Sequence, residues 1–172
     1  RVSSFRVLVF LSSIIIVGGL AVLASSFGFM PEKTEASTTD NVSGYAWSEN
    51  IGWISFNCTD TGNCGTSNYG VNIDSVTGNL SGYAWSEHIG WISFNAADIA
   101  GCPAGVCQGR LSNGVLLGWA KALSAASGAS GWDGWISLNC ENSGTCGTSN
   151  YGVTLSDPEF NGYAWGSDVV GW

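Results

Sequence analysis

Residues 44–56 read GYAWSENIGWISF, and almost the same phrase returns as GYAWSEHIGWISF at 82–94. A third copy begins as GWAK at Gly118 and, after an insertion of Ser, Ala and Gly, resumes as GWISL at 134–138. A fourth begins as GYAW at 162–165 and reaches Gly171-Trp172. A unit of roughly 40 residues that cannot bury its own apolar face must stack on its neighbours. The phrase therefore predicts about three and a half stacked repeats.

Each repeat carries the pattern of short antiparallel strands. Two runs, at 45–48 and 53–56, are aromatic and β-branched and flank a short turn, which is a hairpin signal. A third run at 69–73 precedes the turn DSVTG. With a period of two, one face of 53–56 carries Trp and Ser while the other carries Ile and Phe. We expect either that both faces are covered or that one row of Trp is open to a ligand.

Composition supports an all-β domain and excludes one class of partner. The chain of 172 residues has 25 Gly and nine Trp, and only 10% of its residues are charged. From Glu32 onward three Lys or Arg residues face 13 Asp or Glu residues. This negative charge repels phosphate, so we expect no nucleic-acid partner.

The six cysteines belong to the repeat. They follow the GWIS runs in pairs, and the first and third loops, NCTDTGNCGTSNYGV and NCENSGTCGTSNYGV, are close copies. We expect an exported protein with one disulfide inside each loop, joining the pairs Cys58 and Cys64, Cys102 and Cys107, and Cys140 and Cys146. The spacing is wider than C-x-x-C and the chain has a single histidine, His88, so we expect neither a zinc site nor another cofactor.

No catalytic constellation stands out. Glu49 and Glu87 occupy the same turn position in successive repeats, which favours solvated turn residues over a glycosidase pair. Asp60, Asp74 and Asp133 lie in Gly- and Asn-containing loops that offer oxygen ligands to calcium, but they do not form an EF-hand series. We therefore expect a protein that is not an enzyme.

The beginning of the chain has a different composition. No charged residue occurs at 7–30, and as a helix this run would be about 36 Å long, enough to cross a bilayer. Arg1 and Arg6 precede it, which predicts that the repeats lie outside the cell. We expect three segments: an apolar helix at 1–30, a polar linker at 31–43 and a β-repeat head at 44–172. A cleaved signal peptide and a simple membrane anchor are alternatives for the helix.

The apolar segment also carries a stripe of small residues. Pairs of Ser or Gly recur every six or seven residues, and such stripes let helices pack closely. The residues expected to mediate helix assembly are Phe5, Val9, Ile14, Ile15, Gly18, Gly19 and Leu23.

Two resemblances bear on function. An N-terminal apolar helix followed by a β-rich head resembles a type IV pilin in outline, in which such helices bundle into a filament core. The GYAW and GWISF phrases resemble tandem repeats of bacterial secreted or surface proteins whose function is not established. Both resemblances imply a cell-surface location.

Together these patterns predict a structural subunit of an extracellular, pilin-like filament. Its partners would be copies of itself, and the membrane before assembly. The incomplete last repeat would close against the first one or accept a strand from a neighbouring subunit. The alternative is a membrane-anchored surface module that binds glycans through Trp47, Trp85 and Trp165.

Overall fold

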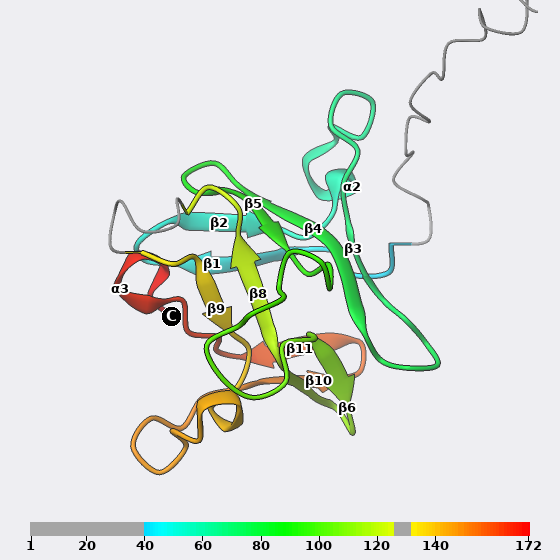
Figure 1. Cartoon of the computed structure of the whole chain (residues 1–172). Coiled ribbons are helices and arrows are strands. Elements are labelled where there is room, and N and C mark those ends of the chain that lie inside the picture. Colours follow the sequence, from blue (N-terminus) through cyan, green and yellow to red (C-terminus); the bar gives the residue numbers. More distant parts are fainter. Residues whose placement is uncertain (1–39, 126–131) are drawn as a thin grey trace, which may run out of the picture. The chain divides into compact units, whose positions relative to one another are not determined.

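The computed structural model describes residues 40–125 and 132–172, and these are built mainly of short β-strands (Figure 1). One sheet has seven strands, of which six follow the order β1-β2-β4-β5-β8-β9 and β3 pairs with β4. Their bounds are β1 Tyr45–Ser48, β2 Gly52–Ser55, β3 Val71–Ile73, β4 Leu80–Ser86, β5 Gly90–Ser93, β8 Trp119–Ala122 and β9 Trp135–Ser137. The other sheet has the order β11-β10-β7-β6. Its strands are β6 Arg110–Ser112, β7 Val115–Leu117, β10 Val153–Ser156 and β11 Glu159–Gly162.

The repeated phrase forms one hairpin per copy. β1 pairs with β2, β4 with β5, and β8 with β9, always antiparallel. The second strand of each hairpin then pairs with the first strand of the next, β2 with β4 and β5 with β8. The fourth copy continues this rule, because Trp165 forms an antiparallel bridge with Ser137 of β9.

Each repeat also contains a second hairpin. The predicted third run of the first repeat is β3, and it pairs with the beginning of β4. In the next two repeats the equivalent pairs are β6 with β7 and β10 with β11. The returning arm of this second hairpin was not expected from the sequence, because in the first repeat it merges without a break into the next GYAW phrase.

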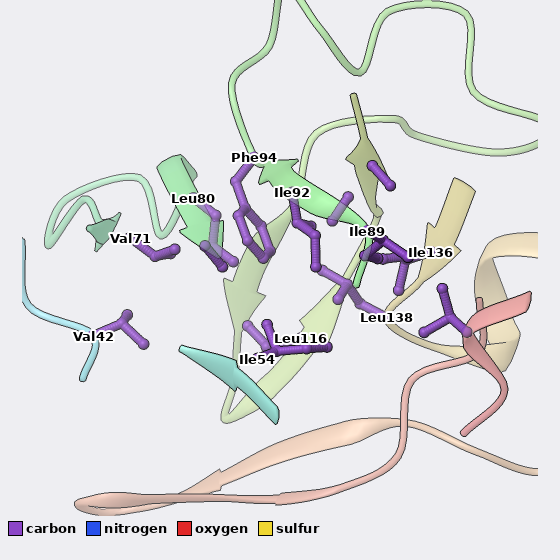
Figure 2. Close-up of a cluster of buried hydrophobic side chains, with 14 of the residues drawn as sticks. Val42, Ile54, Val71, Leu80, Ile89, Ile92, Phe94, Leu116, Ile136 and Leu138 are labelled. Atoms are coloured by element: carbon purple, nitrogen blue, oxygen red, sulfur yellow. The ribbon is translucent and has the colours of Figure 1, made fainter. Parts of the chain in front are cut away.

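The core lies on the face of the first sheet that carries the Ile residues (Figure 2). Ile54, Ile92 and Ile136 come from the second strand of each hairpin and are almost fully buried. Side chains of the second hairpins, such as Val71 and Leu116, pack in the same cluster. Burial of one such side chain stabilises the fold by about 1.5–3 kcal/mol, so this repeated row of Ile is a main source of stability.

A serine fixes each tight turn between the hairpin strands. The hydroxyl of Ser48 accepts hydrogen bonds from the N–H groups of Asn50 at 3.1 Å and Ile51 at 3.2 Å. Ser86 plays the same part for His88 and Ile89 in the second copy. These bonds satisfy backbone donors that have no strand partner, which explains why the SENI and SEHI segments turn at the same point.

The structure contains three disulfides, and their pairing inside the loops agrees with the expected one. They join Cys58 to Cys64, Cys102 to Cys107, and Cys140 to Cys146. In two loops the first cysteine begins a single helical turn, α2 (Cys58–Thr61) and the 3₁₀ turn η1 (Cys140–Ser143), after an Asn cap. These disulfides fit an oxidising, extracellular environment.

The predicted fold class was wrong in its helical part. All helical elements in the described chain are single turns of four residues, α2, η1 and α3 (Ser167–Val170), which close loops rather than form a layer. In the part that the structure describes, no helix has the length and apolar character needed to cross a membrane. The expected helix at 1–30, with its assembly residues, lies outside the described residues.

The first described residues already belong to the β-domain. Asn41, which we assigned to the linker, donates a hydrogen bond to the carbonyl of Ile73 and accepts one from its N–H group, both at 2.8 Å. Val42 forms an antiparallel bridge with Val71 and is buried.

Substitution of a repeat glycine offers a matched test of this packing. Gly44 and Gly82 occupy the same repeat position with positive φ angles of 92° and 88°. A Cβ atom at residue 82 would lie 2.1 Å from the carbonyl oxygen of Gly70, whereas nothing lies within 4 Å at residue 44. Both Gly→Ala changes introduce left-handed strain of about 1–2 kcal/mol, but Gly82→Ala adds an overpacking cost of about 1–3 kcal/mol.

We therefore expect Gly82→Ala to lower the free energy of unfolding more than Gly44→Ala does, by about 1–3 kcal/mol. Urea denaturation of both variants and the parent protein measures this difference. Equal losses would show that residue 82 does not pack against the carbonyl of Gly70 as described.

Candidate functional site

One face of the first sheet carries the Tyr and Trp side chains of every repeat, and we call it the aromatic face. The register puts Trp47 opposite Trp53 and Trp85 opposite Trp91, while the Ile residues point to the core. The aromatic face comprises Tyr45, Trp47, Trp53, Tyr83, Trp85, Trp91, Trp119, Trp135, Trp165 and Trp172.

The tryptophans pair in a repeated geometry. The ring centroids of Trp47 and Trp53 are 4.8 Å apart at an interplanar angle of 64°. Those of Trp85 and Trp91 are 4.6 Å apart at 61°. In the first hairpin the N–H of Phe56 bonds to the carbonyl of Gly44, so by alternation the Trp pair occupies a non-hydrogen-bonded position, where facing side chains are closest. The edge-to-face contact is therefore a product of the register.

The third repeat replaces one tryptophan of the pair with a cation. Lys121 stands at the position of Trp47, and its Nζ lies 4.5 Å from the ring centroid of Trp135. In the same repeat Trp119 takes the position of Tyr45 and is buried, with its indole N–H bonded to the carbonyl of Ala104 at 2.8 Å. This repeat keeps its geometry by exchanging a ring contact for a cation–π contact.

A groove of 490 Å³ opens on the aromatic face beside the third and fourth repeats. It combines aromatic rings with hydroxyl groups and one carboxylate. Its lining residues are Pro103, Trp119, Asp133, Trp135, Ser137, Ser143, Thr145, Thr148, Ser149, Tyr151, Trp165, Ser167 and Trp172. We call this feature the aromatic groove.

The hydroxyl groups of the aromatic groove come largely from the third disulfide loop. The disulfide between Cys140 and Cys146 closes this loop. The hydroxyl of Thr148 donates to the carbonyl of Thr145 at 3.1 Å, which keeps the loop folded beside the rings. The loop therefore sets polar groups at the edge of an apolar surface.

The last tryptophan is held in the groove by two ring contacts. The centroid of Trp172 lies 4.5 Å from that of Trp165 and 5.1 Å from that of Tyr151. The second contact repeats an earlier one, in which Tyr69 lies 5.4 Å from Trp91. The fourth repeat thus places its rings as the second does.

The three tryptophans expected to contact glycans stand at one repeat position but in different surroundings. Trp47 is 55% exposed, whereas Trp85 and Trp165 are half-buried against their neighbours. Trp165 lines the aromatic groove, and the other two lie elsewhere on the aromatic face. Sequence reasoning missed Tyr151 and Trp172 as lining residues, although the repetition of SNYG in the two similar loops was a usable signal.

The aspartates considered for calcium binding are engaged in local structure, whereas Glu49 and Glu87 are exposed. Asp60 accepts a hydrogen bond from the N–H of Gly44 at 2.7 Å, and Asp133 accepts one from the N–H of Trp135 at 3.2 Å. The N–H of Thr77, then its hydroxyl and the N–H of Val76, hold the pKa of the Asp74 carboxyl below its ordinary value. Within residues 40–125 and 132–172, no three His, Cys, Asp or Glu side chains gather as a metal site.

Comparison with known proteins gives no match: no protein-family model, no curated protein and no solved structure matches the chain. We therefore infer function from the residues that line the aromatic groove.

A double-mutant cycle tests whether the repeated tryptophan pair contributes to stability. We expect Trp47→Ala, Trp53→Ala and the double variant to give a coupling free energy of about 0.5–1.5 kcal/mol, because edge-to-face rings attract beyond the area they bury. Urea unfolding of the four proteins measures it. A coupling near zero would mean that these two rings, both more than half exposed, are adjacent without attraction.

Proposed function

We propose that this chain is a non-enzymatic, exported surface module that binds neutral polysaccharide in the aromatic groove. The observation that carries the proposal is the combination of four Trp rings and one Tyr ring with a rim of Ser and Thr hydroxyls in one groove. Glycan binding was the alternative function predicted from the sequence. The proposed binding site is now the aromatic groove and not the single residues Trp47, Trp85 and Trp165.

The chemistry of the groove suits a sugar ring. A pyranose has an apolar C–H face that packs on an indole ring and a periphery of hydroxyl groups that need hydrogen-bond partners. Trp135, Trp165 and Trp172 offer such ring surfaces. Thr148 and Ser149 offer hydroxyls that both donate and accept.

Charge favours a neutral ligand. Asp133 is the one charged side chain among the described residues that line the groove, and it is anionic. The whole chain has a formal net charge of −8. An anionic polymer would approach this surface against repulsion, and the nearby cation, Lys121, is already stacked on the ring of Trp135.

An extracellular location is part of the proposal. Three disulfides within short loops support it, because such bonds persist outside the reducing cytoplasm. Assembly into a filament through residues 1–30 is not needed for this function.

A matched pair of tryptophan substitutions tests the proposal. Trp172→Ala removes a half-exposed ring from the groove, and Trp47→Ala removes a similarly exposed ring outside it. We expect Trp172→Ala to weaken binding of neutral oligosaccharides about 10- to 100-fold, because loss of a stacked ring costs about 1.5–3 kcal/mol. Trp47→Ala should leave the affinity within about twofold.

Isothermal titration with glucan, mannan and chitin oligomers, and with alginate as the anionic comparison, gives the affinities. Val76→Ala, a change at a 91% exposed turn residue, serves as a control for nonspecific effects. Absence of binding to every neutral glycan, or equal losses for Trp47→Ala and Trp172→Ala, would reject the groove as the site.

A further inference from the structure

A second cavity, of 640 Å³, lies on the core side of the first sheet, between β1 and residues 158–164. Its walls are mainly apolar and include Ile54, Ile92, Ile136, Phe56 and Phe94, while Ser48, Glu159 and Asn161 lie among the polar lining residues. Protein interiors hold few voids larger than a water molecule, and an engineered cavity of about 150 Å³ is already large enough to bind benzene. An open cleft of this size beside the core can therefore accommodate a further strand.

The repeat geometry identifies the kind of element. In the first three hairpins the Gly-Trp pair is followed by Ile, Ser and a large apolar residue, and the Ile side chains line the cavity. In the fourth repeat Trp172 holds the position of Trp91, since its distance to Trp165 is 4.5 Å where Trp91 lies 4.6 Å from Trp85. A strand continuing this geometry would run along the cavity.

The edge of β1 is available for such a strand. Among the described strands, β1 pairs with β2 alone. Because the hydrogen bonds to β2 pass through Gly44 and Ala46, the N–H groups of Tyr45 and Trp47 point to the other side. In the earlier repeats this side of the first strand is occupied, as β2 occupies the side of β4.

The turn of the fourth hairpin already lies beside the turn of the first. The hydroxyl of Ser48 donates to the carbonyl of Val170, and the side-chain amide of Asn50 donates to the carbonyl of Asp168 at 3.1 Å. These contacts bring the two ends of the sheet together at one end of the cavity and leave the space between them unfilled.

We propose that this cavity is a strand-binding slot, which takes an extended peptide partner with the alternating pattern Ile-Ser-Phe or Ile-Ser-Leu. The partner pairs antiparallel with β1 in the register that β2 uses with β4, so that its Ile faces Ser48 and its Ser faces Trp47. Its apolar side chains enter the core beside Ile54 and Phe56, and its Ser lies on the aromatic face. A charged strand would bury unpaired charges among these apolar walls.

A tethered strand tests the slot without depending on sugar binding. The probe is the full chain with the tetrapeptide ISFN, a copy of residues 54–57, fused after Trp172. Tethering raises the effective concentration of a peptide too short to bind tightly by itself. The matched control carries DSDN at the same place.

We expect the ISFN fusion to raise Tm by about 5 °C or more and to slow hydrogen exchange at the amide of Trp47 at least about tenfold, because the register pairs this residue with the Ser of the tail. The DSDN fusion should do neither. Ala46→Glu, which puts a carboxylate in the slot wall at the β1 edge, should abolish the effect of the ISFN tail.

Two results would overturn the proposal. In one, ISFN and DSDN change Tm and amide exchange equally. In the other, the chain without a tail is a dimer with the Trp47 amide already protected, which would mean that a second copy covers the edge of β1. Light scattering of the untailed chain distinguishes the second result.

Discussion

The antiparallel register of the repeated hairpin is the constraint on which the rest of the structure depends. Pairing Trp47 with Trp53 necessarily pairs Ala46 with Ile54, because successive residues of a strand point to opposite faces. One choice of register therefore makes the aromatic face and the buried core at the same time. A slip by one residue would bring the indoles into the core and the Ile residues to the surface.

Because the hairpins stack edge to edge, each one imposes its register on the next. Each second strand covers the edge of the next first strand, so an inner hairpin has no exposed edge while the outer ones do. Each disulfide loop follows the second strand of a hairpin. The disulfide rigidifies this loop beside the aromatic face. The groove appears where such a loop and the rings of two successive repeats come together.

Much of this fold could be predicted from the sequence, because near-identical phrases leave little freedom in the assignment of strands. The all-β repeats, the alternation around Ile54 and the cysteine pairs within loops all depend on local pattern. The long helix was inferred from composition alone at 1–30, and the described part of the chain contains only single helical turns. The groove depends on the contact between Tyr151, in a disulfide loop, and Trp172, in the following repeated phrase, and this contact forms only when the repeats stack.

Trp172 connects the two features from which function is inferred. It lines both the aromatic groove and the slot on the core side. Its ring is held by Tyr151 and Trp165, and its backbone stands where a second strand would begin. A strand pairing with β1 would pack beside Trp172 and so reduce the entropy that the ring loses when a sugar stacks on it. Binding of a strand in the slot and of a sugar in the groove should therefore favour each other, because Trp172 lines both sites.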